Sequence, residues 1–284
     1  MQSIFSLETA QERDFKQGVK ELLGKVIAIA SPKRARTLYL NPASSPAKVS
    51  DRMIMSFLKR RAVNSSQSEF FERLHKDFWR GAAGSNFSDM CDRRFESLFL
   101  AKQGEDIEAL ARLWQHSPVR NIVEFGTGSG RVLNYLTRCL PDVGSVIGVD
   151  INQEQVDKNR QSDNFDERIE FACAEGAEWL ESNGKPNSLF VTNGGVLGYI
   201  RREKLDRMLS HISNNLGPSM FLAIEPIAAD HNWQRQKQSL PFGKELSFSH
   251  NYNDLFESNG FVVCHQRVTD FESWRMVATI ARTS

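Results

Sequence analysis

The fold is decided by the run Asn121-Ile-Val-Glu-Phe-Gly-Thr-Gly-Ser-Gly130, a short apolar strand that leads into a glycine turn. A helical stretch follows, and then Val146-Ile-Gly-Val-Asp150, a second apolar strand that ends in a carboxylate. Glycines allow a tight turn and let a ligand approach the backbone closely. Open α/β sheets hold an adenosine group with this order of elements. The chain is therefore predicted to bind a nucleoside-bearing cofactor, with Asp150 accepting hydrogen bonds from ribose hydroxyls.

The glycine spacing narrows the class of cofactor. A dinucleotide site uses G-x-G-x-x-G to place a pyrophosphate at a helix N-terminus, whereas this chain has G-x-G-x-G with Glu124 two residues before the first glycine. A carboxylate there would repel a pyrophosphate but would attract the ammonium group of an amino acid. The segment Glu124-Phe-Gly-Thr-Gly-Ser-Gly130 resembles motif I of the class I S-adenosylmethionine-dependent methyltransferases at every fixed position.

The resemblance covers residues 119–284 and implies S-adenosyl-L-methionine as the cofactor. It places Glu124 beside the methionine part, the glycines beneath it, Asp150 on the ribose and Glu175 at the adenine amino group. The residues expected at the cofactor are Glu124, Phe125, Gly126, Thr127, Gly128, Gly130, Asp150, Ile151, Glu175, Gly176, Asn193 and Gly194.

Alternative roles are open for four of these positions. Glu124 bonds the cofactor or only local backbone amides, and Asp150 holds the ribose or caps a helix. Glu178 competes with Glu175 for the adenine, although it also fits a solvated helix position. Asn193 orients a ligand or bonds its own backbone as a turn residue.

Residues 119–284 alternate short apolar strands with helical stretches, which predicts an α/β fold with a Rossmann-like, mostly parallel sheet of seven strands. Too few residues separate the last two strands for a crossover helix, so we expect the last strand to be antiparallel, as in the methyltransferase fold. The expected strands lie near residues 120–125, 145–150, 168–172, 187–192, 219–225, 260–266 and 274–281.

Residues 1–118 read instead as a helical N-terminal cap that forms part of the substrate region. We therefore expect two domains, the cap at 1–118 and the cofactor-binding methyltransferase core at 119–284.

Candidate catalytic residues follow the fifth strand or end it. Residues 227–250 form a long segment at the carboxyl edge of the sheet, and it contains His231 and His250. A histidine there would remove a hydroxyl proton near neutral pH, and Glu225 is the third candidate. Each histidine also fits an ordinary surface position. Phe78, Trp79, Tyr199 and Trp233 are the candidate substrate-binding residues, with packing within the cap as the alternative for Phe78 and Trp79.

Composition limits the partners. The 284 residues are 40% hydrophobic and 25% charged with a net charge of +1, which is ordinary for a globular protein and gives no reason to expect a nucleic-acid partner. No apolar run reaches the ~20 residues of a membrane span, so no membrane partner is expected. The four cysteines form no C-x-x-C pair, and Asn193 with Glu225 does not supply a metal cluster. We expect a cytoplasmic enzyme that binds no metal. A homodimer is a possible assembly.

These observations predict a methyltransferase that acts on a small-molecule acceptor, at oxygen rather than nitrogen. The fold serves many acceptors, so it does not name the substrate. N-methylation, a macromolecular acceptor and a catalytically silent cofactor-binding subunit are the alternatives.

Overall fold

The computed structural model describes residues 10–40, 48–63, 72, 75–81, 84–85, 88–89, 92–93, 95–232, 235–242, 247–271 and 274–283. The chain divides into two compact units, which are treated separately below. The helical unit comprises residues 1–71 with 243–246, and the sheet unit comprises residues 72–242 with 247–284.

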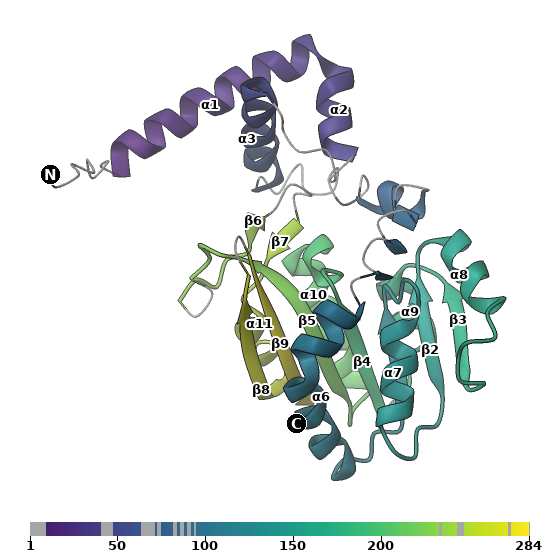
Figure 1. The fold of residues 1–284 in the computed structure, drawn as a ribbon. Helices are drawn as coiled ribbons and strands as arrows, with labels where there is room; N and C mark the ends of the chain where they lie inside the picture. The colour runs from purple at the N-terminus through teal and green to yellow at the C-terminus, as the bar shows by residue number, and fades with distance from the viewer. Residues whose placement is uncertain are drawn as a thin grey trace, which may run out of the picture. The chain divides into compact units, whose positions relative to one another are not determined.

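Three helices form the helical unit: α1 (Ala10–Ala30), α2 (Pro32–Leu40) and α3 (Val49–Val63) (Figure 1). Pro32 suits the first turn of α2 because a backbone N–H has no helical partner there. Helices α1 and α3 pack so closely that a Cβ on Gly24 would lie 2.0 Å from the carbonyl oxygen of Met53. Arg34 of α2 donates two hydrogen bonds to Asp51 of α3, at 3.1 and 2.6 Å. The expected helical N-terminal region is thereby confirmed.

The sheet unit contains a seven-stranded sheet in the order β3-β2-β1-β4-β5-β9-β8. Strands β1 to β5 are parallel, and β9 is antiparallel to both β5 and β8. This topology confirms the predicted mostly parallel sheet with an antiparallel last strand. The strands are β1 (Asn121–Phe125), β2 (Val146–Asp150), β3 (Ile169–Cys173), β4 (Ser188–Asn193), β5 (Met220–Ala228), β8 (Phe261–Asp270) and β9 (Trp274–Thr283).

Helices cover both faces of this sheet, because side chains of buried strands alternate between two apolar layers. On β5, Leu222 and Ile224 join one cluster, whereas Phe221 and Ala223 join the other. The first cluster is closed by α6 (Ala101–Gln115), α7 (Arg131–Cys139) and α8 (Gln153–Arg160). The second is closed by α9 (Gly176–Asn183), α10 (Arg202–Asn215) and α11 (Tyr252–Glu257).

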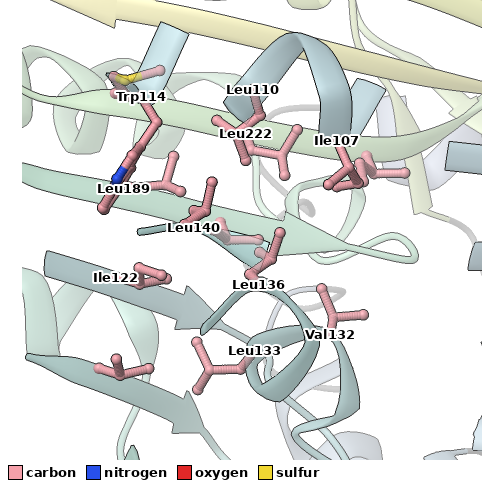
Figure 2. Close-up of a cluster of buried hydrophobic side chains, with 14 of the residues drawn as sticks. Ile107, Leu110, Trp114, Ile122, Val132, Leu133, Leu136, Leu140, Leu189 and Leu222 are labelled. Carbon is pink, nitrogen blue, oxygen red and sulfur yellow. The ribbon is translucent and has the colours of Figure 1, made fainter. Parts of the chain in front are cut away.

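Helix α6 belongs to the sheet unit, although it precedes residue 119. Ile107, Leu110 and Trp114 pack with Leu189 and Leu222 in the first cluster (Figure 2). The sheet unit therefore begins at Glu72, and residue 119 marks the approach to the first strand.

The segment 227–250, which the sequence indicated to be a long loop, contains two short strands. Strands β6 (Leu240–Phe242) and β7 (Ser247–Ser249) pair antiparallel within it, with Pro241 opposite Phe248. In the part of the chain that the structure describes, no helix has both the length and the apolar character to cross a membrane.

Candidate functional site

The predicted cofactor residues come together because the parallel strands end at the same edge of the sheet. Phe125 of β1 lies opposite Val149 of β2 and Thr192 of β4. The residues that follow these three positions are Gly126, Asp150 and Asn193. Open α/β sheets bind their ligands at this carboxyl edge.

The glycine turn needs glycine for two different reasons. Gly126, Gly128 and Gly130 have φ angles of +64°, +49° and +73°, a region that side chains rarely adopt. At Gly126 a Cβ would also lie 2.6 Å from a methyl carbon of Val196. At Gly128 the nearest atom to a Cβ would be the hydroxyl oxygen of Ser88, at 4.0 Å. The turn is therefore closely packed against Val196 at Gly126, whereas the described residues leave space beside Gly128.

Glu124 lies beneath this turn with 2% of its surface exposed. Thr127 Oγ1 donates a hydrogen bond of 2.7 Å to Glu124 Oε2. Burial raises the pKa of Glu124 to about 8; Asp150 adds to the rise, while Thr127 and the backbone N–H of Leu133 oppose it. Glu124 therefore has a local partner in the Thr127 side chain, and the backbone N–H of Leu133 also acts on its pKa. A cationic ligand group near this carboxylate would lower its pKa.

Asp150 closes the other side of the turn. One carboxylate oxygen accepts from the backbone N–H of Gly128 at 2.8 Å, and the other accepts from Asn152 at 2.9 Å. Burial raises the pKa of Asp150. The N-cap of α8 is Asn152, which accepts from the N–H of Gln155 at 3.2 Å. Asp150 is therefore not the cap of α8. Ile151 lies between the two.

Glu175 is engaged on two sides. It caps α9 by accepting from the N–H of Glu178 at 3.1 Å, and its Oε1 accepts from Lys204 Nζ at 3.0 Å. The side chain of Glu178 is 72% exposed, as expected for a solvated helix position. A Cβ on Gly176 would lie 3.0 Å from the ring of Phe125, so this glycine permits close packing at the strand end.

The end of β4 is open. Asn193 is half-buried, and Gly194 follows with a φ of +83°. Apart from its two chain neighbours, no atom of the described residues lies within 4 Å of where a Cβ on Gly194 would be. Gly195, at +111°, carries the chain toward Val196, which covers Gly126. The β4 turn therefore borders the glycine turn and leaves space beside Gly194.

A strap crosses this edge; we use that name for the described residues between Glu72 and Arg93. Asn152 Nδ2 donates to the carbonyl oxygen of Trp79 at 2.9 Å. The rings of Trp79 and His75 contact Tyr199 edge-on, with centroids 5.3 and 4.9 Å apart. Phe78 packs against Trp79 at 5.1 Å. Three of the four predicted substrate residues thus meet here; Trp233 lies outside the described residues.

Polar contacts hold both ends of the strap. Glu72 accepts from Arg201 Nε at 3.1 Å and from Lys204 Nζ at 3.0 Å. At the other end, Ser129 Oγ donates to Asp92 at 2.6 Å. The strap is therefore attached to the β4 side of the edge and to the glycine turn.

The two candidate histidines are fully buried but differ in their partners. His231 Nδ1 pairs with Ser249 Oγ at 2.7 Å, while its Nε2 has no hydrogen-bond partner among the described residues. His250 Nδ1 pairs with Ser239 Oγ at 2.7 Å, and its Nε2 faces the carbonyl oxygens of Leu197 and Ile200, both at 3.2 Å. Burial lowers the pKa of both rings, to about 4 for His250.

Glu225 lies beneath the β4 turn and is also fully buried. Burial raises its pKa to about 7, while the Thr192 hydroxyl and backbone N–H groups of Leu197, Gly198 and Gly195 oppose that rise. Neither carboxyl oxygen forms a hydrogen bond of normal geometry within the described residues. Its position fits support of the β4 turn.

Sequence reasoning missed the residues that attach the strap. Asn152 was detectable as an N-cap before a helical run, but its bond to Trp79 links positions 73 residues apart. Nothing in the sequence indicated that Lys204 is important, because its partners Glu72 and Glu175 come from two distant segments.

The strand order, the glycine turn and the acidic residues at strand ends define the class of S-adenosylmethionine-dependent methyltransferases. Residues 94–266 match the model of a family described as a methyltransferase domain. The chain belongs to this family, and it is a methyltransferase that uses S-adenosylmethionine.

Solved structures share the fold at low sequence identity. A magnesium protoporphyrin IX methyltransferase from Synechocystis PCC 6803, with S-adenosylmethionine bound, is 14% identical with a TM-score of 0.51, over 75% of this chain and 97% of that one. A S-adenosylmethionine-dependent methyltransferase from Leishmania major is 14% identical with a TM-score of 0.55, over 80% and 90%. A sequence comparison with curated proteins gave no match.

The residues at the edge suit this cofactor. A buried carboxylate at Glu124 is complementary to an ammonium group, and Asp150 retains acceptor capacity for hydroxyls. At Gly128 and Gly194 the described residues leave space beside the backbone for a ligand.

Proposed function

We propose that this enzyme transfers the methyl group of S-adenosylmethionine to a hydroxyl oxygen of a small-molecule acceptor. The observation that carries the proposal is the strap, which lies across the cofactor edge from Tyr199 to Asn152. A covered edge favours an acceptor small enough to be enclosed and excludes water from the reaction. The aromatic side chains of Phe78, Trp79 and Tyr199 supply an apolar wall for it.

The proposed cofactor contacts are those of the sequence analysis, with Glu124 at the methionine end and Asp150 at the ribose. The cofactor supplies an activated methyl group on a sulfonium, so the protein needs chiefly to align the acceptor and remove its proton. We assign the strap, which belongs to the sheet unit, to the acceptor side.

Of the three candidate bases we propose His231. Its Nδ1 is held by Ser249, while its Nε2 forms no hydrogen bond of normal geometry among the described residues. The backbone of Gln236 also acts on the ring and opposes the lowering of its pKa. Because burial lowers its pKa, the ring is neutral at pH 7 and able to accept a proton. His250 uses both nitrogens to hold the turn at residues 197–200, and Glu225 supports the turn from below.

The described cysteines Cys139, Cys173 and Cys264 are free thiols, which supports a reducing, cytoplasmic setting.

The test is a turnover assay that measures S-adenosylhomocysteine release with two matched panels of small acceptors, one bearing hydroxyls and one bearing amines. We expect hydroxyl compounds to be methylated, and His231→Gln to lower kcat by a factor of about 10² or more with unchanged cofactor affinity. Turnover only with amines would favour N-methylation, and turnover only with a protein or nucleic acid would overturn the small-molecule assignment. Cofactor binding without turnover on any acceptor would favour a silent subunit.

A further inference from the structure

The helical unit exposes an apolar stripe on α1, formed by Val19, Leu22, Leu23, Val26 and Ile29. Their exposed fractions are 42%, 64%, 43%, 58% and 70%. The spacing of three or four residues puts them on one face of the helix. A contiguous exposed apolar face of this kind marks an interaction site.

The opposite face of α1 already packs on α3. Gly24 meets Met53 there, and Gln17 Nε2 donates to Ser56 Oγ of α3 at 2.7 Å. The stripe therefore does not form the core of the helical unit. No described residue of that unit covers these side chains, so they are open to an occupant from outside it.

The charge of the helical unit identifies the chemistry of this occupant. Residues 10–63 contain 12 Lys and Arg against 4 Asp and Glu, a net charge of +8, whereas residues 64–284 carry 24 against 30, a net charge of −6. Lys20 and Lys25 flank the stripe on α1 and are exposed. On α2, Lys33 and Arg36 are exposed as well. The occupant must accept apolar side chains and carry negative charge around them.

We propose that α1 docks on an anionic lipid surface, with the stripe at the acyl boundary and the basic side chains on phosphate-bearing headgroups. An amphipathic helix with Leu and Val on one face and lysines beside it lies in the plane of such an interface. This is peripheral binding and needs no spanning helix. It revises the expectation of no membrane partner, which considered only spanning segments.

Other occupants fit less well. A second copy of the stripe would bring together two units that each carry a net charge of +6, from 13 Lys and Arg against 7 Asp and Glu. Among described residues of the sheet unit, the large apolar side chains that are exposed are Leu100 and Val262, on separate elements, so that unit offers no matching apolar face. Nucleic acid would use the basic charge but leave the stripe in water.

The test is cosedimentation of the full chain with vesicles of phosphatidylcholine alone and with added phosphatidylglycerol. We expect binding to the anionic vesicles at least tenfold tighter than to the neutral ones, and weaker binding at higher salt. Leu22→Glu combined with Val26→Glu should reduce that binding at least tenfold. The control is Val262→Glu, an exposed valine of the sheet unit, which should bind like the wild type.

Circular dichroism and S-adenosylmethionine affinity, expected to be unchanged, show that the variants are folded. The proposal is overturned if the wild type stays in solution with anionic vesicles, or if Val262→Glu loses binding equally. It is also overturned if the wild type does not bind vesicles and the stripe substitutions instead convert a dimer to a monomer. The same holds if, without vesicle binding by the wild type, those substitutions abolish nucleic-acid binding. None of these readouts depends on the methyl acceptor, so failure here leaves the proposed function intact.

Discussion

The hydroxyl of Thr127 donates a 2.7 Å hydrogen bond to Oε2 of Glu124, and both side chains are buried beneath the glycine turn. A single hydroxyl is weak compensation for a buried carboxylate, and the pKa of Glu124 accordingly rises to about 8. A cationic ligand group beside Glu124 would favour the ionised form of this carboxyl group.

Glu124→Gln should weaken S-adenosylmethionine binding about tenfold, because the amide cannot pair with an ammonium group. Ionised Glu124 is the binding form, so wild-type affinity should also rise as pH increases from 6 to 8, and the variant should lack this rise. Titration calorimetry measures both. Glu178→Gln is the matched control on the exposed first turn of α9. Equal affinity and equal pH dependence in wild type and Glu124→Gln would leave Glu124 with a local role only.

Glu225 should make the sheet unit less stable as pH rises. Its folded pKa of about 7 lies above the unfolded value of 4.5, so its contribution is fully present below pH 4.5 and is lost as pH rises toward 7. The loss is on the order of 3 kcal/mol. Between pH 5 and pH 8, the melting temperature of Glu225→Gln should decrease less than that of the wild type. Identical pH profiles by thermal denaturation would contradict the raised pKa.

Tyr199 should hold the strap in place. Tyr199→Ala removes the edge contacts with Trp79 and His75, so we expect the acceptor KM to rise about tenfold and trypsin to cleave faster after Arg80. Tyr199→Phe keeps the ring and should behave nearly as wild type. A strap that is equally resistant to trypsin in both variants would show that Tyr199 does not hold it.

Asp106 should matter for stability rather than catalysis. It is fully buried on α6, accepts from His265 Nε2 at 2.8 Å and Arg267 Nε at 3.0 Å, and so joins α6 to β8. Asp106→Asn should cost about 3 kcal/mol of unfolding free energy in urea titration. Glu108→Gln, in an exposed pair on the same helix, should cost less than about 0.5 kcal/mol. Comparable losses in the two variants would argue against a special role for the buried pair.

Much of the sheet was predictable, since its strands are apolar runs with turn residues between them. The antiparallel β9 followed from the short link after β8, and the cofactor edge followed from Glu124, the glycines and Asp150. These signals are local, because each depends on residues that are near one another in the chain.

The rest depends on contacts that sequence spacing does not encode. The Asn152–Trp79 and Lys204–Glu72 bonds join distant segments, and α6 shows its place only when Trp114 packs against the sheet. The β6–β7 pair was missed because three-residue strands with Pro241 give almost no alternation. Burial of His231 and His250 was likewise invisible, because polar side chains in a long segment ordinarily face solvent.

Strand β9 lies between β5 and β8, although it follows both in the chain. During synthesis from the amino end, β1 to β5 can pair as they emerge, but β5 keeps an open edge until residues 274–283 leave the ribosome. Met220–Ala228 is almost wholly buried in the finished sheet, so its apolar edge is exposed throughout that interval. A chain that ends before residue 274 would contain all the expected cofactor residues but would leave this edge of β5 free to pair with another chain.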